Sequence, residues 1–87
     1  MTKNVLNELD LAALRHDLPA HGLIRGDIGT VVIVYRGGEA YEVEFVAADG
    51  RTVALETLSA SEVEPVSGKR ILHARSLSST RTSSGTD

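Results

Sequence analysis

A strict alternation of apolar and charged residues over positions 40–46 constrains the fold of this chain more than any other feature. Tyr41, Val43 and Phe45 fall on one side of the segment, and Glu42 and Glu44 fall on the other. Because successive side chains of a β-strand point to opposite faces of a sheet, the pattern predicts a strand with one buried face and one solvated face.

Two neighbouring segments complete a predicted meander of three strands. Residues 28–35 are dense in Val and Ile, and residues 52–58 alternate again between apolar and polar positions. Short runs of this kind, bounded by glycine-containing turns, are typical of antiparallel strands. Two pairs of residues supply the hairpin turns between them: Gly37-Gly38 and Asp49-Gly50.

The first turn predicts the register of the first two strands. A two-residue turn at Gly37-Gly38 places Val34 opposite Tyr41 and Val32 opposite Val43, so that apolar pairs line the core. In this register three residues of the first strand point outward, beside the two carboxylates: Val31, Ile33 and Tyr35.

The second turn is interpreted as a three-residue loop over residues 48–50. With a two-residue loop, Val43 would face Glu56, and core and solvent positions would be mixed on both faces of the sheet. The longer loop instead pairs Val43 with Leu55 and gives Gly50 the left-handed conformation that glycine favours. The further pairs that it predicts are Phe45 with Val53 and Glu42 with Glu56.

The remaining segments complete the order of a small barrel. Residues 9–14 fit either a short strand or a helical turn, and residues 19–29 form a long loop. Residues 59–62 fit one capped turn before a last short edge strand at 63–66. We therefore predict an all-β fold, a five-stranded SH3-like barrel over residues 9–66. Its predicted core is Leu11, Ile28, Val32, Val34, Tyr41, Val43, Phe45, Val53, Leu55, Leu58 and Val63.

Composition restricts the chemistry that this chain can perform. A chain of 87 residues supports one domain, and the absence of cysteine excludes disulfides, thiolate metal sites and cysteine nucleophiles. The longest apolar run has five residues, too few to span a membrane, and the first residues lack the apolar stretch of a signal peptide. We expect a protein of the cytoplasm.

Charge is distributed unevenly along the chain. Residues 1–66 carry eleven acidic and five basic residues, although the net charge of the whole chain is only −3. An acidic domain repels phosphate backbones, so we expect no nucleic-acid binding by the domain itself and a basic protein as its partner. Ordinary colloidal solubility would explain the same charge.

Residues 1–8 are interpreted as an N-terminal extension, and residues 67–87 as a basic tail. Nine of the 21 tail residues are Ser or Thr, and four are Lys or Arg. Such a segment buries too little apolar surface to offset its ordering entropy, so we expect disorder, or order that a contact imposes. The tail fits either a dispensable terminus or a basic arm.

A candidate docking face follows from the predicted registers. Glu42, Glu44 and Glu56 would form an acidic patch on the outer side of the sheet, where repulsion between opposed carboxylates brings a purely structural sequence no gain. An apolar stripe beside it would complete a surface for a partner or for a second copy of the chain: Val31, Ile33 and Tyr35. The alternatives are a solvated acidic face, and burial of the stripe under the N-terminal segment.

No catalytic, cofactor or metal site is predicted. Strand carboxylates supply too few converging oxygens for a divalent cation. His16 and Asp17 point apart in an extended chain, His21 lies in a glycine-bounded turn, and no nucleophile with its base can be assembled. The Arg-Gly-Asp tripeptide at residues 25–27 is interpreted as a tight bend in which the aspartate binds nearby backbone amides. We expect a protein that is not an enzyme.

A series of short motifs occupies residues 18–58: Leu18-Pro19, His21-Gly22-Leu23, Arg25-Gly26-Asp27-Ile28-Gly29-Thr30-Val31-Val32, Tyr41-Glu42-Val43-Glu44-Phe45, Asp49-Gly50-Arg51-Thr52 and Ala54-Leu55-Glu56-Thr57-Leu58. Their ordered combination, rather than any single motif, resembles a small bacterial family catalogued as domain of unknown function 4926. The resemblance covers about residues 9–66.

The resemblance implies a short bacterial protein with an SH3-like fold, often encoded beside another small gene, as toxin–antitoxin pairs are. It supplies no catalytic residues. We therefore expect an interaction module, antitoxin-like or immunity-like, that masks a basic partner. A weaker similarity, through residues 26–31, is to KOW-type barrels of ribosomal and transcription proteins, and implies nucleic-acid binding with cations from the tail. The third alternative is an SH3-like accessory subunit of a larger metalloenzyme.

Overall fold

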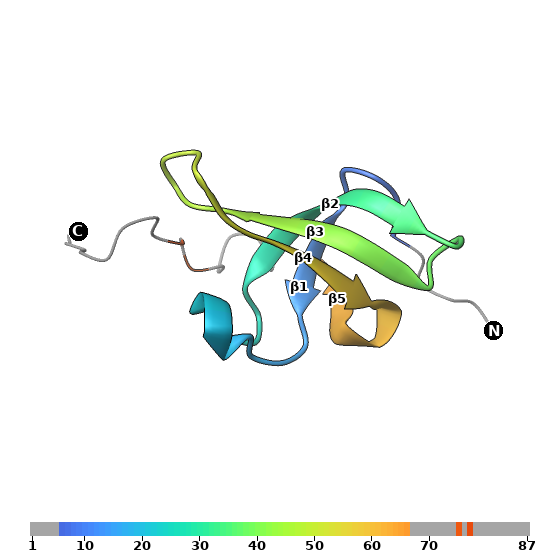
Figure 1. Cartoon of the computed structure of the whole chain (residues 1–87), viewed down its shortest axis with the longest axis horizontal. Helices are drawn as coiled ribbons and strands as arrows, with labels where there is room; N and C mark the ends of the chain where they lie inside the picture. The colour runs from blue at the N-terminus through green and yellow to red at the C-terminus, as the bar shows by residue number, and fades with distance from the viewer. Residues whose placement is uncertain (1–5, 67–74, 76, 78–87) are drawn as a thin grey trace.

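The computed structural model of the chain describes residues 6–66, 75 and 77, and it is an all-β fold around one five-stranded antiparallel sheet (Figure 1). The strands are β1 (Leu11–Leu14), β2 (Ile28–Tyr35), β3 (Ala40–Val46), β4 (Thr52–Ser59) and β5 (Val63–Pro65). Two single turns of 3-10 helix precede β2 and β5: η1 (Pro19–His21) and η2 (Ala60–Glu62). The predicted all-β class and its five strands are confirmed. The described part of the chain contains no helix of the length and apolarity that a membrane span requires.

The sheet has the order β4-β3-β2-β1-β5, so β4 and β5 are its edge strands. Only the three residues of η2 join these two strands, and they bring the end of β4 close to the start of β5. The turn has the predicted cap, because the Ser59 N–H donates to Glu62 Oε1 (2.8 Å). A sheet whose first and last strands meet at one end must coil strongly.

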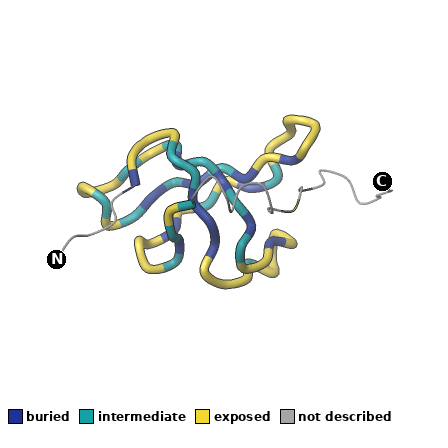
Figure 2. Tube along the Cα trace, turned by 180° about the vertical axis from the view of Figure 1, so that it is seen from behind, coloured by how far each residue is buried: buried dark blue, intermediate teal, exposed yellow. Residues whose placement is uncertain are grey.

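The alternation in β3 is confirmed. Tyr41, Val43 and Phe45 are at most 1% exposed, whereas Glu42 and Glu44 lie on the opposite side of the strand and are half-buried. Figure 2 shows the resulting alternation of buried and intermediate residues along the strands, with exposed residues gathered in the turns.

The register between β2 and β3 is confirmed next to the turn and is wrong beyond it. Val34 pairs with Tyr41 as predicted, but Val43 pairs with Val31 rather than with Val32. Val32 is therefore an extra residue, a β-bulge, which the sequence pattern does not reveal. As a consequence Val31 points into the core and is fully buried, contrary to the prediction that it faces outward.

The register between β3 and β4 differs in the same way. Near the turn Val46 pairs with Thr52, as the predicted three-residue loop requires. A second bulge at Val53 then shifts the pairing by one residue, so that Val43 faces Glu56. The sequence pattern argues against this pairing because it places a carboxylate on the core side of β4. The predicted pairs that it replaces are Val43 with Leu55 and Phe45 with Val53.

The bulges and the two ends of the chain change the membership of the core. Five predicted core residues are buried: Tyr41, Val43, Phe45, Leu58 and Val63. Two more are partly buried and pack against them: Val34 and Val53. The prediction is wrong for Leu55, which is exposed, and for three residues that are only half-buried: Leu11, Ile28 and Val32.

Leucines that the prediction omits fill the rest of the core. Leu14 and Leu23 come from β1 and from the loop before β2, and both are at most 1% exposed. Leu6 and Leu77 join the same cluster from the two ends of the chain. Apart from residues 75 and 77, the predicted tail, His73 included, lies outside the described residues.

Glycine at position 29 allows β2 to approach β3 closely. A Cβ at Gly29 would lie 2.6 Å from Val43 Cγ1 and 2.8 Å from the Glu44 carbonyl oxygen, distances at which real Cβ atoms are essentially never found. The sequence pattern indicates only a hinge at this position, whereas the structure requires glycine for packing.

Candidate functional site

The outward side of β2, β3 and β4 forms one continuous surface, here called the outer face. Glu42 of β3 pairs with Ile33 of β2 and with Thr57 of β4, and Glu44 pairs with Leu55. Residues opposite each other in an antiparallel pair point to the same side of the sheet. The apolar and acidic residues of the outer face are Ile33, Tyr35, Glu42, Glu44, Val46 and Leu55.

Large apolar side chains are exposed together on the outer face. Six large hydrophobic residues are exposed in the described part of the chain, and four of them lie here: Ile33 (43%), Tyr35 (38%), Val46 (39%) and Leu55 (51%). Ile33 and Tyr35 lie on the β2 side of the two carboxylates, and Leu55 lies on the β4 side. Single apolar residues are ordinary on a protein surface, whereas several on one face are typical of a surface that another molecule covers. The predicted exposure of Ile33 and Tyr35 is confirmed, and the described residues of the N-terminal segment do not bury Ile33.

Hydroxyl groups hold the two carboxylates of the outer face in place. Glu42 Oε1 accepts hydrogen bonds from Thr57 Oγ1 (2.6 Å) and from Tyr35 Oη (3.2 Å). Glu44 Oε2 accepts one from Thr52 Oγ1 (2.7 Å). Desolvation, together with the hydrogen bond to Glu42 and its negative charge, raises the pKa of Tyr35 above the ordinary value.

No lysine or arginine among the described residues pairs with Glu42 or Glu44. Each carboxylate uses one oxygen for the hydroxyl contacts above, and the other oxygen is suited to a charge-assisted hydrogen bond from a cation. The outer face therefore combines exposed apolar groups with two oriented negative charges.

Glu56 does not belong to this surface, and the predicted patch of three carboxylates is wrong. The bulge at Val53 turns Glu56 to the side of the sheet that carries Val43, opposite to Glu42. There its Oε2 lies 2.7 Å from Nε2 of His21 in η1, within ion-pair distance. Glu42 faces Thr57 instead, so the predicted repulsion between Glu42 and Glu56 is replaced by a hydrogen bond.

Val31 is also removed from the predicted surface. Its side chain is buried, its N–H donates to Asp10 O (2.9 Å), and its carbonyl accepts the Leu9 N–H (2.7 Å). Leu55 and Val46 take its place as exposed apolar residues. The sequence signal for Leu55 is obscured because a strand with a bulge reverses the side of every residue beyond it.

A second group of charged side chains lies where β1 and β5 pair. Arg15 Nη1 is 3.3 Å from Glu64 Oε1, and His16 Nε2 is 3.0 Å from Glu62 Oε2. The backbone carbonyl of Asp17 and the Glu62 carboxylate raise the pKa of His16. Within residues 6–66 no three His, Asp or Glu side chains converge to hold a metal ion.

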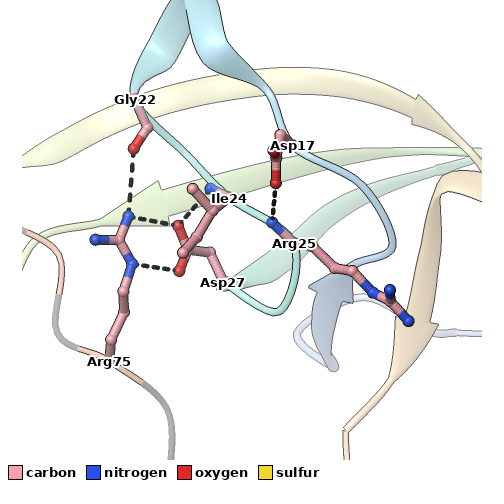
Figure 3. A network of polar contacts seen from close by, with 6 residues as sticks. All are labelled: Asp17, Gly22, Ile24, Arg25, Asp27 and Arg75. Carbon is pink, nitrogen blue, oxygen red and sulfur yellow. Dashed lines mark hydrogen bonds and ion pairs between the residues drawn. The ribbon is translucent and has the colours of Figure 1, made fainter.

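The loop before β2 buries a carboxylate. Asp27 is 2% exposed, and its Oδ2 accepts the Ile24 N–H (2.9 Å), as Figure 3 shows. This confirms the prediction that the aspartate accepts a hydrogen bond from a nearby backbone amide, and Gly26 makes the bend with a φ of 93°. The Arg25 side chain points away from Asp27 (Figure 3), so the tripeptide serves the fold of the loop.

The whole of this arrangement from β1 to β5 falls inside one family match. Residues 8–65 match the profile of a family described as "Domain of unknown function (DUF4926)". The chain belongs to this family. The predicted resemblance is thereby confirmed at the level of the family. No curated protein and no solved structure matches the chain.

The limits of the DUF4926 match divide the described residues into two groups. The outer face, the His16 and Glu62 pair and the loop with Asp27 all lie inside the matched region. Arg75 and Leu77 lie beyond its last residue.

Proposed function

We propose that this member of the DUF4926 family is a non-enzymatic protein-interaction module of the cytoplasm that binds a basic protein through the outer face. The observation that carries the proposal is the concentration of four exposed apolar side chains around Glu42 and Glu44. Protein interfaces combine exposed apolar groups with oriented polar groups, and the outer face carries both.

The spacing of the two carboxylates indicates the chemistry of the partner. Glu42 and Glu44 lie two residues apart on one strand, about 7 Å along it. An extended segment with two Arg or Lys residues at the same spacing, flanked by apolar residues, would match both charges and the apolar surface around them. The acidic balance of residues 1–66 would steer such a segment toward the domain.

The narrower hypothesis of an antitoxin-like or immunity-like protein is weakened by the position of Glu56. It rests on an acidic patch of three carboxylates, of which the outer face keeps two. The bacterial origin, the SH3-like barrel and the small neighbouring gene are implications of the family resemblance. They make the product of the adjacent gene the first partner to test.

Neither alternative function gains a specific observation. KOW-type nucleic-acid binding would draw its cations from the tail, but one of these, Arg75, is bound to Asp27 of the domain. An accessory role in a larger enzyme would need a surface that binds the catalytic subunit. The outer face is no better suited to a catalytic subunit than to a basic peptide.

The proposal is tested by comparing two variants with the same change in charge. In Glu42→Lys/Glu44→Lys the change falls on the outer face, and in Glu8→Lys/Glu39→Lys it falls on exposed residues outside it. The full chain is used to isolate a stoichiometric partner from the native host, and affinities are then measured by calorimetry. We expect the first variant to bind at least about tenfold more weakly and the second to bind almost normally.

Two results would count against the proposal. Equal losses in both variants would assign the interaction to bulk charge rather than to the outer face. Recovery of no stoichiometric partner, with the basic product of the adjacent gene also failing to bind, would remove the proposed function.

A further inference from the structure

Asp27 receives a guanidinium from the far end of the chain. Arg75 Nε donates to Oδ1 (2.6 Å) and Arg75 Nη2 donates to Oδ2 (2.8 Å), so two parallel hydrogen bonds join the groups. Nη2 also donates to the Gly22 carbonyl (3.2 Å), as Figure 3 shows. The loop of residues 22–27 thus presents three acceptor atoms arranged for the fork of an arginine.

This loop needs a cation. A carboxylate that is only 2% exposed loses most of its hydration, and burying it without a partner is costly. Arg75 is the one cation paired with Asp27 among the described residues. A lysine would carry the charge but could not make the paired hydrogen bonds.

A second contact lies two residues after Arg75. Leu77 is 8% exposed and belongs to the hydrophobic core cluster, and its carbonyl accepts the Ala48 N–H (3.1 Å). An arginine followed two residues later by a leucine can therefore reach the Asp27 loop and the core together.

The residues that form the site and the residues that occupy it lie in different parts of the chain. Gly22, Asp27 and Ala48 lie within the DUF4926 match, whereas Arg75 and Leu77 lie beyond it. The Arg75 side chain is also 47% exposed, so solvent and other molecules reach the contact.

From this geometry we propose that residues 22–27 and Ala48 form a binding site for peptide segments of the form Arg-X-Leu. In this structure the site is occupied by the chain's own Arg75 and Leu77. A segment of a protein partner with the same pattern binds there by replacing them. The attached segment competes at the high effective concentration of a tethered ligand, so a partner must bind tightly or be abundant to displace it. This site lies apart from the outer face and does not depend on the proposed function.

The test uses the full chain with its own ligand removed. The variant is Arg70→Ala/Arg75→Ala/Leu77→Ala, in which Arg70 is also replaced because Arg70 and Leu72 repeat the pattern. The probe is a synthetic peptide of residues 73–80, titrated while the amide resonances of Ile24 and Ala48 are followed by NMR. We expect both resonances to return toward their wild-type positions as the peptide binds, because the two amides face the site.

Matched controls define the specificity. Peptides with lysine in place of the arginine, or alanine in place of the leucine, should bind at least about tenfold more weakly. Adding Asp27→Asn to the variant should cause a loss of the same size, and the wild-type chain should bind the peptide more weakly than the variant does.

Three results would overturn the proposal. They are no change at Ile24 and Ala48 under excess peptide, equal binding to the Asp27→Asn chain, and a complex that forms only between the variant and the whole wild-type chain. The last would assign the site to a second copy. Should the variant unfold, refolding by the peptide in circular dichroism supports the proposal, and persistent unfolding under excess peptide contradicts it.

Discussion

At the scale of single residues, His16 and Glu62 make local stability depend on pH. The pKa of His16 is raised above its ordinary 6.5. The contribution of protonated His16 to folding stability is therefore present below pH 6.5 and is lost as the pH rises through the raised value. The pKa of Glu62 is lowered from 4.5, first by the Ser59 backbone N–H, so its contribution is present above pH 4.5 and is lost on acidification. The pair is strongest between pH 4.5 and 6.5.

We predict that an NMR titration of the three histidines gives His16 a pKa above 6.5. In Glu62→Gln the pKa of His16 should fall but remain above 6.5, because the carbonyl of Asp17 is the larger cause and is unchanged. Glu64→Gln, which removes the neighbouring partner of Arg15, should leave the His16 pKa where it was. A wild-type value at or below 6.5 would contradict the prediction.

At the scale of elements, two β-bulges decide which side chains reach the outer face. Val32 in β2 and Val53 in β4 lie on the two strands that flank β3. A bulge increases the local twist of its strand, and this sheet needs twist because η2 joins its two edges. Each turn sets the register only as far as the bulge, and beyond it every side chain changes sides.

Substitutions at two adjacent positions of β4 test this register. We predict that Leu55→Asp changes the free energy of unfolding by less than about 1 kcal/mol, because Leu55 is exposed. Ala54→Asp should cost more than about 3 kcal/mol or prevent folding, because Ala54 lies in the core and the new carboxylate would be buried without a partner. Urea denaturation measures both. If Leu55→Asp proved the more destabilising of the two, the register without a bulge would be the correct one.

At the scale of the whole molecule, residues near both ends of the chain complete the core. The Leu6 N–H donates to Tyr41 Oη (3.2 Å) beneath the sheet, and Leu77 is buried with Ala47 in the same cluster. The fork between Arg75 and Asp27 spans 48 positions of sequence. The predicted basic tail therefore contributes contacts to the domain at these two described positions.

We predict that Arg75→Ala lowers the free energy of unfolding by about 2 kcal/mol. Breaking a fully buried ion pair costs ~3–5 kcal/mol, and the half-exposed guanidinium reduces that figure. The double variant Asp27→Asn/Arg75→Ala should be more stable than Arg75→Ala alone, because it leaves no buried charge unpaired. Arg25→Ala, whose side chain points away from Asp27, should change stability by less than about 0.5 kcal/mol. Equal stability of the single and double variants in urea denaturation would refute the prediction.

Features that depend only on neighbouring residues can be predicted from the amino-acid pattern. The alternation in β3, the three-residue loop over residues 48–50 and the cap of η2 are local patterns, and each has the structure that its residues predict. The first turn keeps the predicted register of Val34 with Tyr41, but it spans residues 36–39 rather than two glycines. The exposure of Ile33 and Tyr35 follows as well, because both lie between the first turn and the first bulge.

The directions of the side chains beyond the bulges depend on how distant strands pack together. The bulges supply twist that the coiling of the whole sheet requires, so no local pattern marks Val32 or Val53, and the sides of Val31, Leu55 and Glu56 could not be predicted. The partner of Asp27 could not be predicted either, because a contact between residues 48 positions apart depends on how the whole chain folds. The outer face and the Arg-X-Leu site are therefore products of packing, built on strands whose local pattern is already evident in the sequence.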